Sequence, residues 1–106
     1  VVCVYKDRII FDTGSKSLCL DKGAHGNQTV NGFGNIIGHP EVRIERLSEE
    51  HGVGVLLNET NLKLNDKVKI IPNHACTVVN QFDEYVVHEN GQVIEVWKVD
   101  ARGMVK

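Results

Sequence analysis

Apolar and polar residues alternate with a period of two in several short stretches of this chain of 106 residues. Residues 41–47 alternate charged and apolar side chains, which is the pattern of a strand that buries one face. Residues 85–88 and 92–96 flank an Asn90-Gly91 pair, a dipeptide typical of a tight β-hairpin. The remaining strands that the pattern predicts lie at residues 1–5, 8–12, 53–57 and 66–71.

Helical periodicity does not extend beyond a turn or two anywhere, and we expect only a short helical turn near residues 76–80. Residues 23–40 hold five of the ten glycines and predict a long loop, either functional or a mobile surface insertion. The sequence therefore predicts an all-β fold: a small β-barrel or sandwich of about seven or eight short strands with little helix, in one domain over residues 1–106.

Composition and charge exclude some classes of function. An apolar content of 42% and a charged content of 25% are ordinary for a globular domain. A net charge of −2 without a basic stripe argues against nucleic-acid binding, and no long apolar run predicts a membrane span.

Cys3 and Cys19 lie among apolar residues, so we expect packed thiols and a reducing, cytoplasmic setting. The chain opens directly on an apolar strand and has no Met at position 1, and we therefore expect it to be a domain of a longer protein.

The candidate chemistry lies at His74 and Cys76, just after Pro72 ends a predicted strand. On an extended backbone, side chains two residues apart point to the same side. A nitrogen and a sulfur donor would suit zinc, in an open site completed by water, substrate or other residues. By spacing alone, a packed cysteine beside a capping or surface histidine is the more common explanation.

Four segments, in order, resemble motifs of one enzyme family. Residues 11–18 and 20–23 resemble its D-x-G-x-K-x-L … D-x-G stretch, and residues 47–52 resemble its L-x-E-E-H-G. Residues 72–80 resemble its P-[NS]-H-x-[CD]-x-x-x-N, and residues 87–97 with 101–103 resemble its closing hairpin and tail. The chain thereby resembles the C-terminal domain of the D-serine dehydratase and D-threonine aldolase family over nearly its whole length. Four ordered motifs are far more specific than one His-x-Cys.

The resemblance implies a longer enzyme in which an N-terminal alanine-racemase-like (β/α)₈ barrel carries pyridoxal phosphate on a lysine. This β domain would pack against the barrel and supply His74 and Cys76 as ligands of a divalent metal, with zinc preferred over manganese because one ligand is a thiolate. His51 and Glu50 are candidates to orient a metal ligand by hydrogen bonding to it, and His51 could instead meet a catalytic group. A structural role is the more common explanation for His51. The partners implied are the barrel domain, a D-amino acid substrate and a second copy in a homodimer.

The activity implied is that of a pyridoxal phosphate- and metal-dependent lyase acting on D-3-hydroxyamino acids. D-serine dehydration is favoured over D-threonine aldol cleavage because Cys76 stands where aldolases of the family typically carry Asp. The cofactor would stabilise the carbanion and the metal would act as a Lewis acid on the β-hydroxyl. No catalytic or cofactor-binding residue is expected in this chain, Lys16 fits a surface lysine, and the isolated domain should be inactive.

Two other functions remain open from the residues: a non-catalytic β-barrel interaction domain and an isolated zinc-binding module. For a domain that lacks its barrel, the apolar first strand and the apolar content of 42% also predict an exposed apolar face, because the surface that the barrel would cover has no partner. We therefore expect this chain to self-associate.

Overall fold

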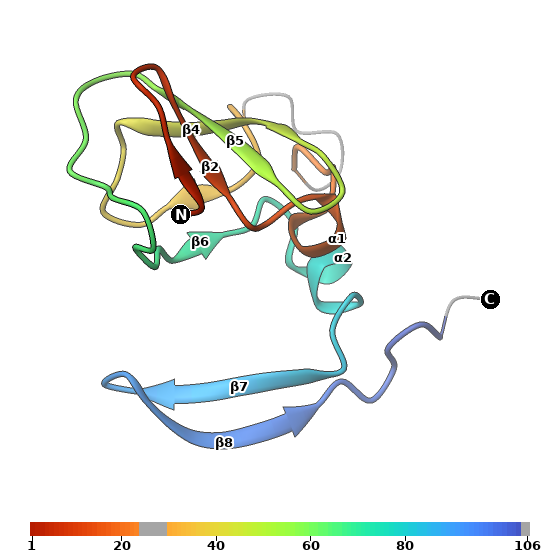
Figure 1. Ribbon diagram of the computed structural model, residues 1–106. Coiled ribbons are helices and arrows are strands. Elements are labelled where there is room, and N and C mark those ends of the chain that lie inside the picture. The colour runs from red at the N-terminus through yellow and green to blue at the C-terminus, as the bar shows by residue number, and fades with distance from the viewer. Residues whose placement is uncertain (24–29, 105–106) are drawn as a thin grey trace.

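The computed structural model describes residues 1–23 and 30–104, so residues 24–29 of the expected glycine-rich loop lie outside it (Figure 1). Within these residues the chain forms eight short strands and two short helices. The elements are β1 (Cys3–Val4), β2 (Arg8–Phe11), α1 (Ser15–Leu18), β3 (Asn35–Ile36), β4 (Val42–Leu47), β5 (Gly52–Leu56), β6 (Ile70–Ile71), α2 (Ala75–Val79), β7 (Glu84–Glu89) and β8 (Gln92–Lys98). The predicted all-β fold with little helix is confirmed.

The strands form three antiparallel sheets in the described part of the chain, and they do not close there into a single barrel. The main sheet has the strand order β1-β2-β5-β4, and the two-stranded sheets are β3-β6 and β7-β8. In the middle of the main sheet, Gly54 lies opposite both Ile9 and Ile44. A Cβ atom at Gly54 would lie 2.8 Å from the ring of Phe11, so this strand position is a glycine because neighbouring side chains cover it.

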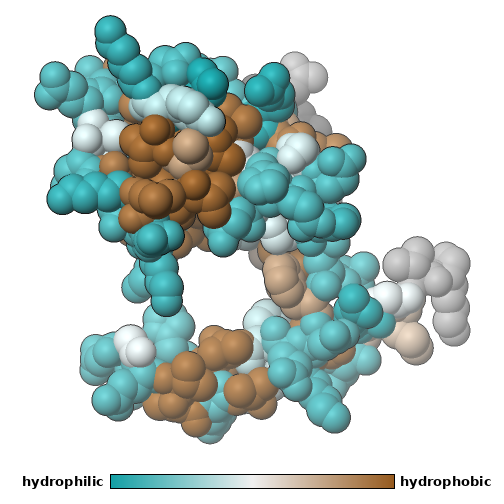
Figure 2. All heavy atoms as spheres, viewed as in Figure 1, coloured by the Kyte–Doolittle hydropathy of each residue, from teal (hydrophilic) through white to brown (hydrophobic). Residues whose placement is uncertain are grey.

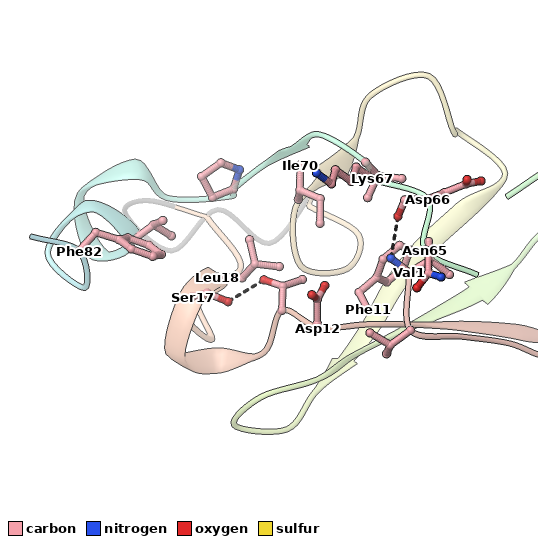
Figure 3. Close-up of a pocket in the computed structure, with 15 residues that line it drawn as sticks. Val1, Phe11, Asp12, Ser17, Leu18, Asn65, Asp66, Lys67, Ile70 and Phe82 are labelled. Carbon is pink, nitrogen blue, oxygen red and sulfur yellow. Dashed lines mark hydrogen bonds between the residues drawn. The ribbon is translucent and has the colours of Figure 1, made fainter. Parts of the chain in front are cut away.

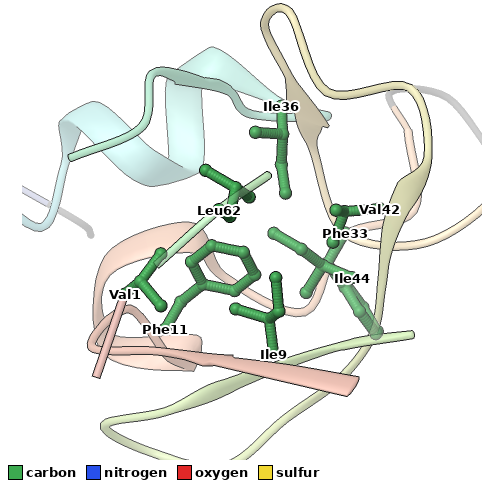
Figure 4. Packing of buried hydrophobic residues seen from close by; sticks show 8 residues of the cluster. All are labelled: Val1, Ile9, Phe11, Phe33, Ile36, Val42, Ile44 and Leu62. Atoms are coloured by element: carbon green, nitrogen blue, oxygen red, sulfur yellow. The ribbon is translucent and has the colours of Figure 1, made fainter. Parts of the chain in front are cut away.

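The core lies between the main sheet and the segments that cross its inner face (Figure 4). Its fully buried side chains are Phe11, Ile9 and Ile44. Val42 of β4 and Ile36 of β3 also belong to the cluster, and residues outside the strands complete it: Val1, Phe33 and Leu62. Strands alone therefore do not close this core, and the loops on either side of β3 and β6 supply the opposite wall.

Strand β4 follows the predicted alternation only in its first half, where Val42 and Ile44 are buried. A β-bulge then leaves Glu45 without an opposite residue on β5. Both Glu45 and Arg46 are exposed, and Leu47 returns to pack against the core. The two successive charged residues mark this bulge in the sequence, because an extra residue resets the alternation of a strand.

The strand expected at residues 66–71 is shorter than predicted, since β6 contains only Ile70 and Ile71. The backbone before β6 bonds to loops instead: the carbonyl of Asp66 accepts from the amino group of Val1, and that of Lys69 accepts from the amide of Ile37. Loop partners thus satisfy the polar groups that a longer ladder would have used.

The hairpin β7–β8 confirms the prediction from Asn90-Gly91. These two turn residues have φ angles of 50° and 81°, the left-handed values that a tight two-residue turn requires. Neither strand pairs with another described sheet, and the hairpin lies apart from the rest of the molecule, beyond α2 (Figure 1). No described helix is long and apolar enough to cross a membrane.

Candidate metal centre

The chain changes from extended to helical between the two candidate ligands. His74 is extended, with φ −140° and ψ 107°, and it precedes α2 as its N-cap residue without a side-chain cap bond. Cys76 already lies in the first turn of α2, which confirms the short helical turn expected near residues 76–80, so the backbone is not extended through both residues. Cys76 is exposed, which rules out the packed thiol that spacing alone favoured.

A carboxylate lies directly beside the imidazole ring. Oδ2 of Asp21 is 3.2 Å from Nδ1 of His74, and the side chains of Asp21 and His74 are 40% and 29% exposed. The same oxygen accepts a hydrogen bond of 2.6 Å from the hydroxyl of Thr77, one residue after Cys76 in α2. Asp21 therefore contacts the chain on both sides of the start of α2, at His74 before the helix and at Thr77 within it.

Asn73 fixes the backbone on which Asp21 lies. Its amide nitrogen donates to the carbonyl oxygens of Asp21 at 3.0 Å and Gly32 at 2.9 Å. Its amide oxygen accepts from the backbone N–H of Gly34 at 3.0 Å. One side chain thus joins segments on both sides of residues 24–29. Asn73 lies within the motif at residues 72–80, but no role of its own was predicted for it from the sequence. Its position directly before His74 was the feature of the sequence that could have indicated this role.

Two of the family-like motifs meet at Gly14. A Cβ atom at Gly14 would lie 2.3 Å from the carbonyl oxygen of Glu49, so only glycine allows this approach. Beside it, Nζ of Lys16 lies 2.5 Å from Oε1 of Glu50. The carboxylate of Glu50 raises the pKa of Lys16, and the ammonium group lowers the pKa of Glu50. This exposed ion pair fits the interpretation of Lys16 as a surface residue.

Glu50 and His51, predicted to orient a metal ligand, lie in the turn between β4 and β5. The N–H of His51 donates to the hydroxyl of Ser48 at 3.1 Å, and the N–H of Ser48 donates back to the carbonyl of His51 at 2.8 Å. The residue His51 is exposed, and Glu50 is paired with Lys16. The carboxylate that faces His74 is that of Asp21, while the predicted role of Glu50 and His51 stays a prediction.

The donor set suits an open metal site. Across residues 1–23 and 30–104, no group of three or more His, Cys, Asp or Glu side chains is arranged to hold a metal ion. His74 and Cys76 alone would offer one imidazole and one exposed thiol, the nitrogen and sulfur donors that zinc prefers. Two protein ligands would leave positions for water, substrate or groups from another domain, and the open metal site stays a prediction.

A separate cavity of about 590 Å³ opens between α1 and the segment that leads into β6 (Figure 3). Its walls are largely apolar and include Val1, Phe11, Leu18, Ile70 and Phe82. Polar groups reach it from Asp12, Ser17 and Lys67. Neither His74 nor Cys76 is among the described residues that line it, so the cavity and the candidate ligands are distinct features of the fold.

Comparison with known proteins gives a family match. A family model described as "Putative serine dehydratase domain" matches residues 1–88. An uncharacterised protein of Mycobacterium tuberculosis is 38% identical over 97 residues, which cover 91% of this chain and 70% of that protein. The 3-hydroxy-D-aspartate aldolase of Paracoccus denitrificans is 37% identical over 84 residues, covering 79% of this chain and 21% of the aldolase.

Solved structures agree with the fold. The crystal structure of D-threonine aldolase from Filomicrobium marinum superposes with a TM-score of 0.80 at 32% identity, covering 100% of this chain and 28% of that one. D-threo-3-hydroxyaspartate dehydratase from Delftia sp. HT23 superposes with a TM-score of 0.73 at 23% identity, a likeness of fold alone. The chain thus spans about a quarter of the length of these enzymes.

Proposed function

This chain belongs to the serine dehydratase domain family, and from that membership we propose that it is the metal-bearing domain of a lyase acting on D-3-hydroxyamino acids. Relatives named D-serine dehydratase, D-threonine aldolase and 3-hydroxy-D-aspartate aldolase support this substrate class. Within it we favour dehydration of D-serine over aldol cleavage of D-threonine, because Cys76 is a soft ligand that suits zinc.

The observation that carries the proposal is the pair of donors at the start of α2. The imidazole belongs to His74, whose backbone is extended, and the thiol belongs to Cys76, in the first helical turn. Cys76 is exposed. The carboxylate of Asp21 occupies the Nδ1 side of the ring, at 3.2 Å, which leaves Nε2 as the nitrogen available to a metal. A zinc ion bound here would supply Lewis-acid polarisation of the substrate's β-hydroxyl.

The contribution of this chain is to hold and orient those donors. Asn73 ties the ligand segment to the backbone of Asp21, and Thr77 ties the helix to the carboxylate of Asp21. The lysine that would carry pyridoxal phosphate belongs, in this proposal, to a barrel domain of the parent chain, because Lys16 is exposed and paired with Glu50. The cofactor would supply the electron sink for the carbanion.

The test uses the full-length parent protein. We expect His74→Ala and Cys76→Ala to lose bound zinc and at least about 100-fold in lyase activity together, because each removes one of two protein ligands. Cys3→Ala is the matched control, since Cys3 is a half-buried cysteine in β1. Metal analysis and assays with D-serine and D-threonine, comparing keto acid with glycine plus aldehyde, give the readout.

Two outcomes are decisive, and a third variant tests the choice of metal. A metal-replete and active His74→Ala variant would refute the metal assignment. Glycine as the main product would overturn the preference for dehydration and leave the metal site standing. Cys76→Asp should retain a metal with a shift in preference from zinc towards manganese, because a carboxylate is a harder ligand than a thiolate.

One observation favours a second candidate, a non-catalytic interaction domain. The matched segment makes up 70% of the Mycobacterium tuberculosis relative, so less of that protein lies outside the match than inside it. A (β/α)₈ barrel needs about 200 residues or more, and the relative has no room for one in its own chain. A parent protein that binds no metal and has no lyase activity would support this candidate.

A further inference from the structure

We propose that Asp21 is a positioning residue for His74: it holds the proton of the ring on Nδ1 and so presents Nε2 to the metal. This inference rests on the proposed metal role of His74 and deepens it. It assigns to Asp21 the part that the sequence had given to Glu50 and His51.

The first support is the contact geometry. Oδ2 of Asp21 lies 3.2 Å from Nδ1 of His74, and these residues are separated by more than fifty positions in the sequence. A metal-bound histidine almost always donates its other ring N–H to a carboxylate, a carbonyl or water, and this fixes both the ring and its tautomer. A carboxylate at Nδ1 therefore selects Nε2 as the metal-binding nitrogen.

The second support is that Asp21 is itself held in place. The hydroxyl of Thr77 donates to the same Oδ2 at 2.6 Å, and Asn73 donates to the backbone carbonyl of Asp21 at 3.0 Å. Both partners belong to the segment that carries His74 and Cys76. Thr77 thus ties the carboxylate of Asp21, and Asn73 ties its backbone, to the segment that carries both candidate ligands.

The chain contains a matched arrangement away from this site. Nδ1 of His39 lies 3.0 Å from Oε1 of Glu41, and the hydroxyl of Thr60 donates to that same oxygen at 2.7 Å. It has the same three groups as the Asp21 site, but no cysteine follows His39 at the spacing of Cys76. Glu41→Gln is therefore the control for Asp21→Asn.

The first measurement is ¹⁵N NMR of the histidine rings in the metal-free chain near pH 8, where imidazoles are largely neutral. We expect His74 to carry its proton on Nδ1. Asp21→Ala should shift His74 towards the Nε2–H tautomer, and Asp21→Asn should do so partly, because asparagine keeps an acceptor oxygen without the charge. Glu41→Gln should change the signals of His39 and leave those of His74 as they are.

The second measurement is titration with Co²⁺, with the sulfur-to-cobalt absorbance of Cys76 as the signal. We expect Asp21→Ala to weaken Co²⁺ binding about 10–100-fold, the usual effect of losing such a partner. Thr77→Val should weaken it less, and Glu41→Gln should not change it. If Asp21→Ala does not fold, as judged by circular dichroism, the Asp21→Asn and Thr77→Val series decides the question.

Two results would overturn the inference: an unchanged His74 tautomer in both Asp21 variants, or cobalt bound through Nδ1 of His74. The two proposals fail separately. If the wild-type chain binds no Co²⁺ and the parent has no lyase activity, the proposed function fails, while the tautomer measurement on the metal-free chain still decides whether Asp21 positions His74.

Discussion

The body of the molecule, formed by β1 to β6 with their loops and helices, and the β7–β8 hairpin bury their apolar residues very differently. Ile9 in β2 is 0% exposed, and Ile94 in β8 is 55% exposed. The hairpin residues are exposed except for Val87, which is half-buried. Figure 2 shows apolar side chains gathered on both regions, with open space between them in this view.

The difference shows that strand formation and burial have separate causes here. The hairpin forms because the turn residues accept positive φ angles and because Tyr85 faces Trp97 and Val86 faces Val96 across the strands. An isolated two-stranded hairpin is marginally stable in water, so this surface is expected to need a partner. The tail after β8 ties the base of the hairpin to the end of α2: Arg102 pairs with Asp83 at 2.9 Å, and the N–H of Gly103 donates to Oδ1 of Asn80 at 2.8 Å.

The largest expected effect separates the two regions directly. Ile9→Ala should lower the free energy of unfolding by about 2–5 kcal/mol, because it leaves a cavity in a closed core. Ile94→Ala, the same change at an exposed position of the hairpin, should stay within about 0.5 kcal/mol. Urea unfolding measures both, followed by circular dichroism for the body and by Trp97 fluorescence for the hairpin. Equal effects would mean that the hairpin is packed as tightly as the body.

Glycine substitutions give the next largest effect. Gly54→Ala should destabilise the body by about 1–3 kcal/mol, because the added Cβ would lie 2.7 Å from a methyl group of Val42. Gly91→Ala meets nothing within 4 Å but has a φ of +81°, so its effect should be confined to the hairpin turn.

The single tryptophan, Trp97, lies in β8 and reports on the hairpin, while circular dichroism reports mainly on the body. We expect Gly91→Ala to move the fluorescence transition to lower urea and to leave the transition of the body in place. Coincident transitions in both variants would show that the two regions unfold as one cooperative unit.

A smaller effect is expected from the carboxylates. The hydroxyl of Thr60, the backbone N–H of Glu41 itself and then His39 hold the pKa of Glu41 below its ordinary value of 4.5. The folded chain therefore holds this proton less tightly than the unfolded chain, so the stabilisation is present above pH 4.5 and is lost as the pH falls towards the folded pKa.

Glu41→Gln should thus lower the free energy of unfolding by about 0.5–1.5 kcal/mol at pH 7, with a smaller difference from wild type below pH 4. Glu95→Gln is the hairpin counterpart, because Glu95 accepts from the indole N–H of Trp97 at 2.5 Å on the exposed surface. Its effect should be smaller at every pH. Urea midpoints measured from pH 3 to pH 8 test this. A difference between wild type and Glu41→Gln that does not shrink below pH 4 would contradict the assignment.

The smallest effect on folding, but a large one on association, is expected from a charged pair in the hairpin. Val86→Glu combined with Val96→Lys places opposite charges on facing residues, which keeps a favourable cross-strand pair while removing apolar surface. The wild-type chain should self-associate and the double variant should be mainly monomeric in sedimentation velocity. A strictly monomeric wild type at high concentration would contradict the predicted partner surface.

Local patterns in the sequence determined a large part of this fold. The alternation at Val42 and Ile44 predicted a strand with one buried face, and Asn90-Gly91 predicted the hairpin and its turn. These signals are readable because side-chain direction and turn geometry depend on neighbours a few residues apart. The ordered motifs likewise pointed to the family that the comparison confirmed.

Tertiary structure alone decided which residues meet at the candidate metal centre. Asp21 contacts His74 and accepts a hydrogen bond from Thr77, which lies 56 positions further along the chain. Nothing in the local sequence of either segment predicts that the two meet. The approach of Gly14 to Glu49 is of the same kind. Only the packing of the loops over one small core brings these groups together, because contacts between distant segments depend on the whole fold and not on the pattern of any one stretch.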